Sequence, residues 1–275
     1  MPTLAQNQGI CEYVLEVPHM LLAINVGNTN VRIGLFEETN LRHTWRIRTE
    51  PHRTADEYEY PLSGIFRSAG VSEPEHVLDA SVFASVVPPL TNVFHETLTR
   101  LAKTAPVQAS TSLNTGIRIG TDNPPEMGAD LLANAVAACH TFKQNCIVID
   151  FGTALTFTVV SQDGEVLGVS IAPGVQGALG SLISETAQLH QVGLLEPPSV
   201  LGKNTTHSIQ SGIMFGFSAL VEGIVERIAR ETKRSYRIIA TGGLSEIFAP
   251  LIPAITCTEP YHTLQGLRIL YELNS

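Results

Sequence analysis

The sequence has no apolar run that looks long enough to cross a membrane. None of its hydrophobic stretches approaches the roughly 20 residues that a membrane-spanning helix needs. The amino-terminal segment also lacks the basic start and apolar core of a secretory signal. The four cysteines show no C-x-x-C pairing, and Cys139 and Cys146 lie in the apolar surroundings typical of buried thiols. These absences predict a cytoplasmic protein without a membrane partner.

Positive charge is also scarce. The 275 residues include 17 lysines and arginines against 26 aspartates and glutamates, so the formal net charge is −9. A surface that binds nucleic acid needs clustered basic residues to neutralise phosphates. The densest basic group, within residues 227–237, is explained by the solvated end of a helix. The composition therefore argues against a nucleic-acid partner.

Two common kinds of catalytic site are missing as well. The nine histidines have no H-x-x-x-H or related ligand spacing, and no G-x-S-x-G elbow is present. The absence of these motifs argues against a zinc enzyme and a serine hydrolase. A hydrophobic content of 44% with 16% charged residues instead indicates a well-cored protein, long enough for two domains.

The most informative stretch that is present runs from Leu21 to Phe36. An apolar segment leads into a Gly-Asn-Thr turn, and apolar and other side chains then alternate. Alternation with a period of two predicts a strand, whereas a P-loop or a dinucleotide-binding turn is followed by a helix. The backbone N–H groups of Gly27, Asn28 and Thr29 would then converge on a point suited to a phosphate. An ordinary hairpin turn explains the same residues.

The same pattern occurs twice. Residues 148–153 repeat residues 23–28 position by position: two apolar residues, Asp or Asn, an apolar residue, Gly, then Asn or Thr. A spacing of 125 residues is far longer than the period of a solenoid and indicates duplication of a whole lobe. Asp163-Gly164 is a further hairpin signal. Each half is therefore expected to open with a three-stranded meander and to continue into helices.

These observations predict an α/β protein with two related lobes. We expect a poorly ordered extension at residues 1–19, an N-terminal lobe at 20–145 and a C-terminal lobe at 146–275. Apolar periodicity predicts the remaining elements. The expected helices cover residues 54–69, 91–103, 128–138, 177–189, 208–232 and 264–273, and further strands cover 41–47, 77–87 and 236–240.

Three places are candidates for chemistry between the lobes. Gly242 and Gly243, in a turn after a buried strand, allow close approach of a phosphate or a flat ring. Asp150 is suited to bind a cation, or to satisfy the N–H groups of its own turn. Asp130 opens an alanine-rich helix, where it either orients an attacking hydroxyl group or stabilises the first helical turn. A nucleotide held between the lobes accounts for the three glycine turns together.

Seven short motifs follow one another along the chain. They are Asn25-Val26-Gly27-Asn28-Thr29, Gly128-Ala129-Asp130, Asp150-Phe151-Gly152-Thr153, Ala172-Pro173-Gly174, Leu201-Gly202-Lys203-Asn204-Thr205, Thr241-Gly242-Gly243 and Leu264-Gln265-Gly266-Leu267. In this order they resemble type III pantothenate kinases, of the superfamily of acetate kinase, sugar kinases, Hsp70 and actin. The resemblance runs from about Met20 to Leu273. It implies a duplicated actin-like (ribonuclease H-like) fold, in which helices flank a mixed sheet in each lobe.

The resemblance implies ATP-dependent phosphorylation of pantothenate, the first step of coenzyme A biosynthesis. It also implies Mg²⁺, a monovalent cation (K⁺ or NH₄⁺), and a homodimer with acceptor sites near the subunit interface. Asp130 would be the catalytic base and Asp150 the ligand of the monovalent cation. The implied ATP contacts are Asn25, Gly27, Asn28, Thr29, Thr153, Gly242 and Gly243, and the implied pantothenate contacts are Thr121, Gly128, Ala129, Leu131 and Thr186.

Four positions depart from the family pattern. The family usually has Asp where Asn25 and Thr158 stand, Tyr near Thr121, and Arg where Leu131 stands. Asn25 removes a charge that helps to organise a divalent metal, and Leu131 removes a forked donor for the pantothenate carboxylate. A hydrogen bond to a charged group contributes about 1.5–3 kcal/mol. Two alternatives follow: a non-catalytic relative that binds nucleotide or a metabolite as a regulator, and a kinase for another small hydroxylated acceptor.

Overall fold

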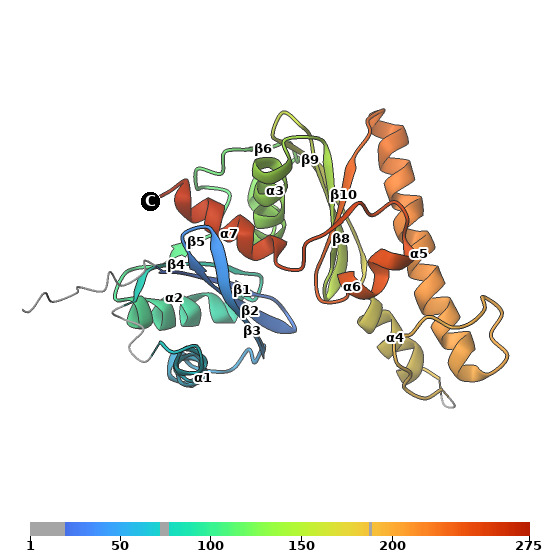
Figure 1. Ribbon diagram of the computed structural model, residues 1–275, viewed down its shortest axis with the longest axis horizontal. Coiled ribbons are helices and arrows are strands. Elements are labelled where there is room, and N and C mark those ends of the chain that lie inside the picture. Colours follow the sequence, from blue (N-terminus) through green and yellow to red (C-terminus); the bar gives the residue numbers. More distant parts are fainter. Residues whose placement is uncertain (1–19, 72–76, 187–188) are drawn as a thin grey trace, which may run out of the picture.

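The computed structural model describes residues 20–71, 77–186 and 189–275. Two mixed sheets lie on either side of a central pair of helices, α3 and α7, and further helices cover the outer faces of the sheets (Figure 1). The extension predicted at residues 1–19 lies outside the described residues.

The first sheet has five strands in the order β3-β2-β1-β4-β5. Strands β1, β2 and β3 form an antiparallel meander, and β4 and β5 join it in parallel. Helices α1 and α2 bury the outer face of this sheet, where Ile24, Ile33 and Phe83 share a core with Tyr58 and Phe94. The bounds are β1 Met20–Val26, β2 Asn30–Glu37, β3 Asn40–Arg48, α1 Ala55–Ser68, β4 Leu78–Ser85, α2 Pro88–Ala102 and β5 Val107–Gln108.

The second sheet has six strands in the order β11-β10-β7-β8-β9-β6. Strands β7, β8 and β9 form its antiparallel meander. Its strands are β6 Arg118–Ile119, β7 Cys146–Phe151, β8 Ala154–Val160, β9 Glu165–Pro173, β10 Arg237–Thr241 and β11 Cys257–Thr258. The remaining helices are α3 Ala129–Phe142, α4 Val175–Ser184, α5 Thr205–Thr232, α6 Ser245–Phe248 and α7 His262–Glu272, with short 3-10 turns at Pro124–Glu126 and Ala249–Leu251.

The two meanders are equivalent, as the repeated sequence pattern predicts. In both sheets a glycine turn joins the first two strands, and a parallel strand pairs with the other edge of the first strand. The second hairpin is one residue shorter, because Asn25 pairs with Arg32, seven positions along the chain, whereas Asp150 pairs with Thr156, six positions along. Asn25 and Asp150 nevertheless occupy the same place on the first strand of each meander. The duplicated hairpins therefore present matching positions to the space between the lobes.

Several predicted element boundaries are wrong. The strand expected to reach residue 87 ends at Ser85, and the next helix begins at Pro88 rather than Thr91. Proline is accepted in the first turn of a helix because the N–H group that it lacks has no partner there. The helix expected over residues 177–189 is α4, which begins at Val175 and ends at Ser184.

Two elements pair with or pack on the sheet that is built mainly from the other half of the chain. Strand β6 pairs with β9 of the second sheet, although it precedes α3 in the sequence. Helix α7, at the other end of the chain, packs over the first sheet, where Leu264 and Leu267 share a core with Leu21 and Ala23 of β1. Helix α3 contributes Leu132 to the same core. Helices α3 and α7 thus form one layer between the lobes (Figure 1).

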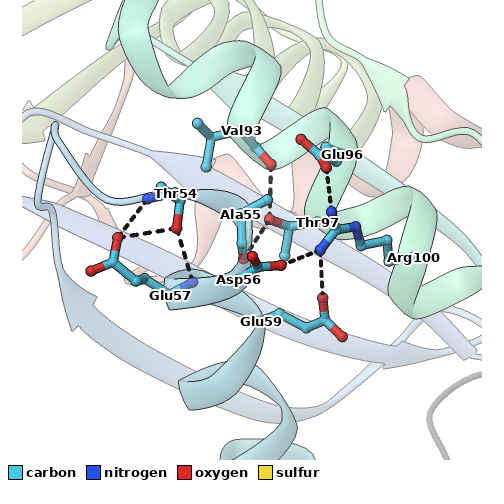
Figure 2. A network of polar contacts seen from close by, with 9 residues as sticks. All are labelled: Thr54, Ala55, Asp56, Glu57, Glu59, Val93, Glu96, Thr97 and Arg100. Atoms are coloured by element: carbon cyan, nitrogen blue, oxygen red, sulfur yellow. Dashed lines mark hydrogen bonds and ion pairs between the residues drawn. The ribbon is translucent and has the colours of Figure 1, made fainter.

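A polar network joins α1 to α2 on the surface of the first lobe. The guanidinium group of Arg100 on α2 contacts the carboxylates of Asp56, Glu59 and Glu96 (Figure 2). The side chains of Thr54 and Glu57 bond reciprocally to each other's backbone N–H groups, which defines the start of α1. These contacts are exposed to solvent, so packing of the apolar faces accounts for most of the stability here.

Helix α5 corrects one expectation from the sequence. Its 28 residues, Thr205–Thr232, are long and apolar enough to cross a membrane by length and composition alone. Half of its most apolar 18-residue segment is buried inside the fold. Ile209, Ile213 and Val221 pack there into the core of the second lobe. The apolar character of α5 is explained by this packing.

The substitution Gly266→Ala should destabilise the protein. A Cβ atom at this position of α7 would lie 1.9 Å from the carbonyl oxygen of Ala133 on α3, so the two helices would have to separate. Such overpacking costs about 1–3 kcal/mol or more in the free energy of unfolding. Denaturant unfolding followed by circular dichroism measures the loss.

Gly64→Ala on α1 is the matched control. No atom lies within 4 Å of the Cβ position at Gly64, so helix propensity predicts a gain of about 0.5–1 kcal/mol. Equal stabilities of the two variants would contradict the close packing of α3 and α7.

Candidate active site

A cleft of about 450 Å³ lies between the two glycine hairpins. The β1–β2 and β7–β8 hairpins form opposite walls, the first turn of α3 contributes Asp130, and the turn after β10 contributes Gly243. The cleft brings together eight residues predicted from the sequence: Asn25, Gly27, Asn28, Thr29, Asp130, Asp150, Thr153 and Gly243. Asn30, Arg32, Arg46, Val86, Phe151, Gly152, Ala154, Thr156, Gln176, Gly177, Leu244 and Thr263 complete its lining.

The two hairpin turns touch across the cleft. The hydroxyl oxygens of Thr29 and Thr153 lie 2.8 Å apart and form a hydrogen bond between the lobes. Each turn is closed by a glycine N–H: Gly27 donates to the carbonyl of Asn30, and Gly152 donates to that of Ala154. The expectation that the N–H group of Gly27 points at a phosphate is therefore wrong, because that group is bonded within its own turn. The exposed residues Asn28, Thr29 and Thr153 remain at the cleft, where polar groups suit the oxygens of a phosphate chain.

Strand pairing places polar side chains in two facing rows. On the first lobe Asn25, Arg32 and Arg46 are aligned across β1, β2 and β3. On the second lobe Thr241, Asp150 and Thr156 are aligned across β10, β7 and β8. The first row carries two positive charges, whereas the second carries one carboxylate.

Asp150 is the most perturbed carboxylate of the cleft. Burial raises the pKa of Asp150 from its ordinary 3.8 to about 6, while the positive charge of Arg32 acts in the opposite direction and the nearby Asp130 adds to the rise. The side-chain amide of Asn134 donates to Asp150 Oδ2 at 3.3 Å. A buried carboxylate with one amide donor is poorly compensated, so it favours a bound cation.

A buried polar chain orients Asn134 for this contact. The hydroxyl of Thr263 on α7 donates to Asn134 Oδ1 at 2.8 Å, so the amide nitrogen is directed at Asp150. His262 Nε2 lies 3.1 Å from the carbonyl oxygen of Asn134. Burial lowers the pKa of His262 to about 4, so the ring is neutral and its Nε2–H donates to that carbonyl. Helix α7 thereby positions a residue of α3 that contacts β7.

Asp130 lies in the first turn of α3, as its place in the alanine-rich segment predicts. Its Oδ1 atom accepts the backbone N–H of Leu131 at 2.8 Å. Burial raises the pKa of Asp130, and hydrogen bonds from the N–H groups of Leu131 and of Asp130 itself oppose that rise. A partly desolvated carboxylate facing a cleft is suited to accept a proton.

The Thr-Gly-Gly turn brings β10 against Asp150. Gly242 has a φ of +92°, and a Cβ atom there would lie 2.4 Å from Asp150 Oδ1 and 2.6 Å from the nitrogen of Phe151. Only glycine satisfies both the positive φ and the close approach. Gly242 therefore shapes the floor beneath Asp150, and Gly243 is the member of the pair that lines the cleft.

Several predicted substrate residues lie outside the cleft lining. Gly128, Ala129 and Leu131 flank Asp130 at the start of α3. Thr121 follows β6, and its buried hydroxyl has no hydrogen-bond partner. Thr186 lies beyond the end of α4, where its hydroxyl donates to the carbonyl of Leu182 at 2.5 Å. The structure therefore does not bring Thr121 or Thr186 into the cleft of its own chain.

Five polar residues that build the site are not among those predicted from the sequence. Arg32 was detectable, since it lies in the alternating strand directly after the predicted phosphate turn. Arg46, Asn134, Thr156 and Thr263 gave no comparable signal, because only strand register and the packing of α3 against α7 bring them to the cleft.

The cleft can accept a metal that arrives with phosphates. Within the described residues, no group of three or more His, Cys, Asp or Glu side chains could hold a metal alone. The cleft does contain the carboxylates of Asp130 and Asp150, and the buried Oδ1 of Asn25 accepts no hydrogen bond. Because Mg²⁺ usually takes one or two carboxylates together with substrate phosphates and waters, this donor set fits magnesium.

Comparison with known sequences identifies close relatives. A family model described as type III pantothenate kinase matches residues 21–227. The type III pantothenate kinase of Roseiflexus sp. strain RS-1 is 44% identical over 255 residues, which are 93% of this chain and 99% of the relative. Those of Pelobacter propionicus and Geobacter sulfurreducens are 42% and 40% identical, again over 93% of this chain and over 100% and 99% of their own lengths.

Comparison with solved structures confirms the predicted fold class. Component A of (R)-2-hydroxyglutaryl-CoA dehydratase from Acidaminococcus fermentans superposes with a TM-score of 0.55 at 13% identity, over 92% of this chain and 96% of its own. The inorganic polyphosphate/ATP-glucomannokinase from Arthrobacter sp. strain KM gives 0.50 at 15% identity, over 93% and 99%. At these identities the similarity concerns the duplicated actin-like α/β fold alone.

The effect of Asp150→Asn on stability should depend on pH. Because the folded-state pKa is raised to about 6, the protonated carboxyl is favoured in the folded state, and stability is lost as the pH rises from 3.8 through 6. The neutral amide should therefore stabilise the ligand-free protein at pH 8 by about 3 kcal/mol, and the gain should shrink toward pH 4. Denaturant unfolding at a series of pH values tests this.

Asp163→Asn, at an exposed position in the turn between β8 and β9, is the control for amide substitution as such. A gain from Asp150→Asn that is constant across the pH series would rule out a buried, ionisable carboxylate as its cause.

Proposed function

The chain belongs to the type III pantothenate kinase family, and from this premise we propose that it phosphorylates pantothenate with ATP. The product is 4'-phosphopantothenate, and the reaction is the first step of coenzyme A biosynthesis. The observation that carries the proposal is the position of Asp130, which faces a cleft walled by two duplicated phosphate-binding hairpins. A proton acceptor beside a phosphate site is the minimum that phosphoryl transfer to an alcohol requires.

The reaction follows from this placement. Asp130 accepts the proton of the primary hydroxyl group while the hydroxyl oxygen attacks the γ-phosphorus of ATP. The bond from that phosphorus to the bridging oxygen breaks, and ADP leaves with the bridging oxygen. The transition state is loose, so catalysis depends mainly on positioning and on screening of charge. The raised pKa of Asp130 makes it a stronger proton acceptor than an exposed aspartate.

The nucleotide occupies the space between the hairpins. Gly27, Asn28 and Thr29 on one wall and Thr153 on the other contact the phosphates, and the Gly242-Gly243 turn leaves room at the end of β10. Asn25 supplies an uncharged oxygen where the family pattern has a carboxylate. A bound Mg²⁺ would neutralise charge on the phosphates, and the unpartnered Oδ1 of Asn25 is the side-chain oxygen available to hold it together with the phosphate oxygens.

A monovalent cation, K⁺ or NH₄⁺, is assigned to Asp150. Thr156 and Thr241 flank Asp150 on the neighbouring strands, and their buried hydroxyl groups have no hydrogen-bond partners. Hydroxyl oxygens and a carboxylate are hard ligands suited to such an ion. The raised pKa of Asp150 supports this assignment, because a bound cation would stabilise the ionised form.

The acceptor lies at the start of α3. Gly128, Ala129 and Leu131 surround Asp130 there, and Thr121 and Thr186 are assigned to the acceptor through the family pattern. Thr186 does not line the cleft of its own chain, which favours an acceptor site completed in a homodimer.

Exposed apolar side chains of the second lobe are candidates for contacts in such a dimer. Among the described residues, five of the eight large hydrophobic side chains classed as exposed fall between residues 171 and 201. They are Ile171, Leu182, Leu195, Val200 and Leu201. Exposed apolar side chains are common at interaction surfaces.

The location that we propose is the cytoplasm. The cysteines within the described residues are free thiols, which is typical of proteins in that reducing compartment.

Asp130→Asn should abolish phosphorylation and leave nucleotide binding intact. Removal of the base lowers turnover by about 10²–10⁴-fold, because the amide cannot accept the proton. ADP release is measured with purified protein, Mg²⁺ and K⁺, with pantothenate compared against a panel of small hydroxylated acceptors. Asp163→Asn, far along the chain in an exposed turn, should retain wild-type turnover.

The outcomes separate the possible functions. Turnover with pantothenate that depends on Asp130 supports the proposal. Turnover with another acceptor, and none with pantothenate, identifies a kinase of different specificity. The apolar side chain of Leu131 beside the base would then explain the changed specificity. Nucleotide binding without turnover on any acceptor identifies a non-catalytic relative.

Leu131→Arg should improve the use of pantothenate. The guanidinium group would supply a forked donor beside Asp130, and a new charge-assisted bond to the pantothenate carboxylate should lower KM by about tenfold or more. Leu131→Gln provides the polar but uncharged control. A KM that responds equally to Gln and Arg would show that charge at this position does not recognise the acceptor.

A further inference from the structure

Two arginines of the first lobe face each other across neighbouring strands. Arg32 on β2 and Arg46 on β3 are directly paired in the antiparallel register, and both line the cleft. Like charges placed directly opposite each other destabilise a sheet. A bound anion is the simplest compensation for such a pair at the wall of a cleft.

Among the described residues, the other two arginines of β3 form ion pairs, whereas Arg46 does not. Arg42 pairs with Glu37, and Arg48 pairs with Glu50 at 3.3 Å. In the part of the chain that the structure describes, neither Arg46 nor Arg32 takes part in an ion pair. Strand β3 therefore leaves unpaired the one arginine that lines the cleft.

Arg32 is held in place by neutral groups. Its Nη1 atom donates to the carbonyl oxygen of Pro260 at 3.0 Å, and its Nη2 atom lies 3.2 Å from the Cβ position of Gly243. The carbonyl orients the guanidinium group without neutralising it. The negative charge of Asp150 acts on Arg32 across the cleft, while the two form no direct ion pair among the described contacts.

The pair is attached to the first phosphate-binding turn. Thr49, directly after β3, donates its backbone N–H to the carbonyl of Thr29 at 3.0 Å and its hydroxyl to the carbonyl of Gly27 at 2.6 Å. These bonds fix the end of β3 against the hairpin. Arg32 also shares its row with Asn25, whose side chain brings no negative charge to this wall.

We propose that Arg32 and Arg46 form an anion subsite that binds the terminal phosphoryl group of the nucleotide. The inference rests on the proposed kinase function and names the residues that recognise the transferred group. Arginine suits this role because its planar fork binds two phosphate oxygens at once and stays charged. With asparagine at position 25, the two guanidinium groups supply on this wall part of the positive charge that phosphoryl transfer requires.

The test compares nucleotides that differ only in the terminal group. Arg46→Gln and Arg32→Gln are titrated calorimetrically with ADP and with a non-hydrolysable ATP analogue, each with and without Mg²⁺. Each variant should lose about tenfold or more in affinity for the ATP analogue, while its affinity for ADP stays within about twofold of the wild type. Arg42→Gln, whose arginine is paired with Glu37, is the matched control and should bind both nucleotides as the wild type does.

Other outcomes overturn the subsite. An equal loss of affinity for ADP and for the ATP analogue would show that the arginines bind the inner phosphates. Unchanged affinity for both nucleotides would show that the arginines do not bind the nucleotide. A higher KM for pantothenate with unchanged nucleotide affinity assigns them to the acceptor carboxylate. Arg46 is exposed, so Arg46→Gln should fold normally, and thermal melting of each variant checks this.

The same measurements separate this inference from the kinase proposal. If wild-type protein releases no ADP with pantothenate but Arg46→Gln still weakens only the ATP analogue, the proposed function fails and the subsite stands. If pantothenate is phosphorylated and both variants bind the two nucleotides as the wild type does, the subsite fails and the proposed function stands.

Discussion

The close packing of α3 against α7 is the constraint on which the rest of the molecule depends. Gly266 lets α7 approach the backbone of α3 at Ala133, and the two helices fill the layer between the sheets. Helix α7 comes from the end of the chain yet covers the first sheet, so its position relates the lobes. The same contact directs Asn134 at Asp150 through the hydroxyl of Thr263. The packing of α3 against α7 therefore also fixes the polar geometry of the cleft.

The two lobes share a scaffold and differ in charge. Rows of aligned side chains on the two sheets carry Asn25, Arg32 and Arg46 on one side and Asp150 between two threonines on the other. Duplication conserves the backbone geometry, because a glycine turn between paired strands is a local structure. The side chains at the same positions have diverged, so that one wall suits anions and the other suits a cation. A nucleotide with its metal requires both.

Particular residues show how far the sequence alone predicts the site. Asp130 and Asp150 both line the cleft, as the sequence predicts, because Asp130 opens an alanine-rich helix and Asp150 lies at the end of a strand beside a recognisable glycine turn. Arg46 and Asn134 were not found, since an arginine in an alternating strand and an asparagine inside a helix have many ordinary explanations. The predicted helix over residues 177–189 extends past the observed end of α4 at Ser184.

The sequence by itself determined the class of the fold, the duplication, the glycine turns and the two carboxylates, because strand alternation and turn chemistry are properties of neighbouring residues. Only the tertiary structure decided which charges meet in the cleft. The pairing of β2 with β3 sets Arg32 against Arg46, and α7 crosses to the other lobe to support a residue that contacts Asp150. These contacts join positions far apart in the chain, and burial among them shifts the pKa of Asp150 to about 6, which no local pattern encodes.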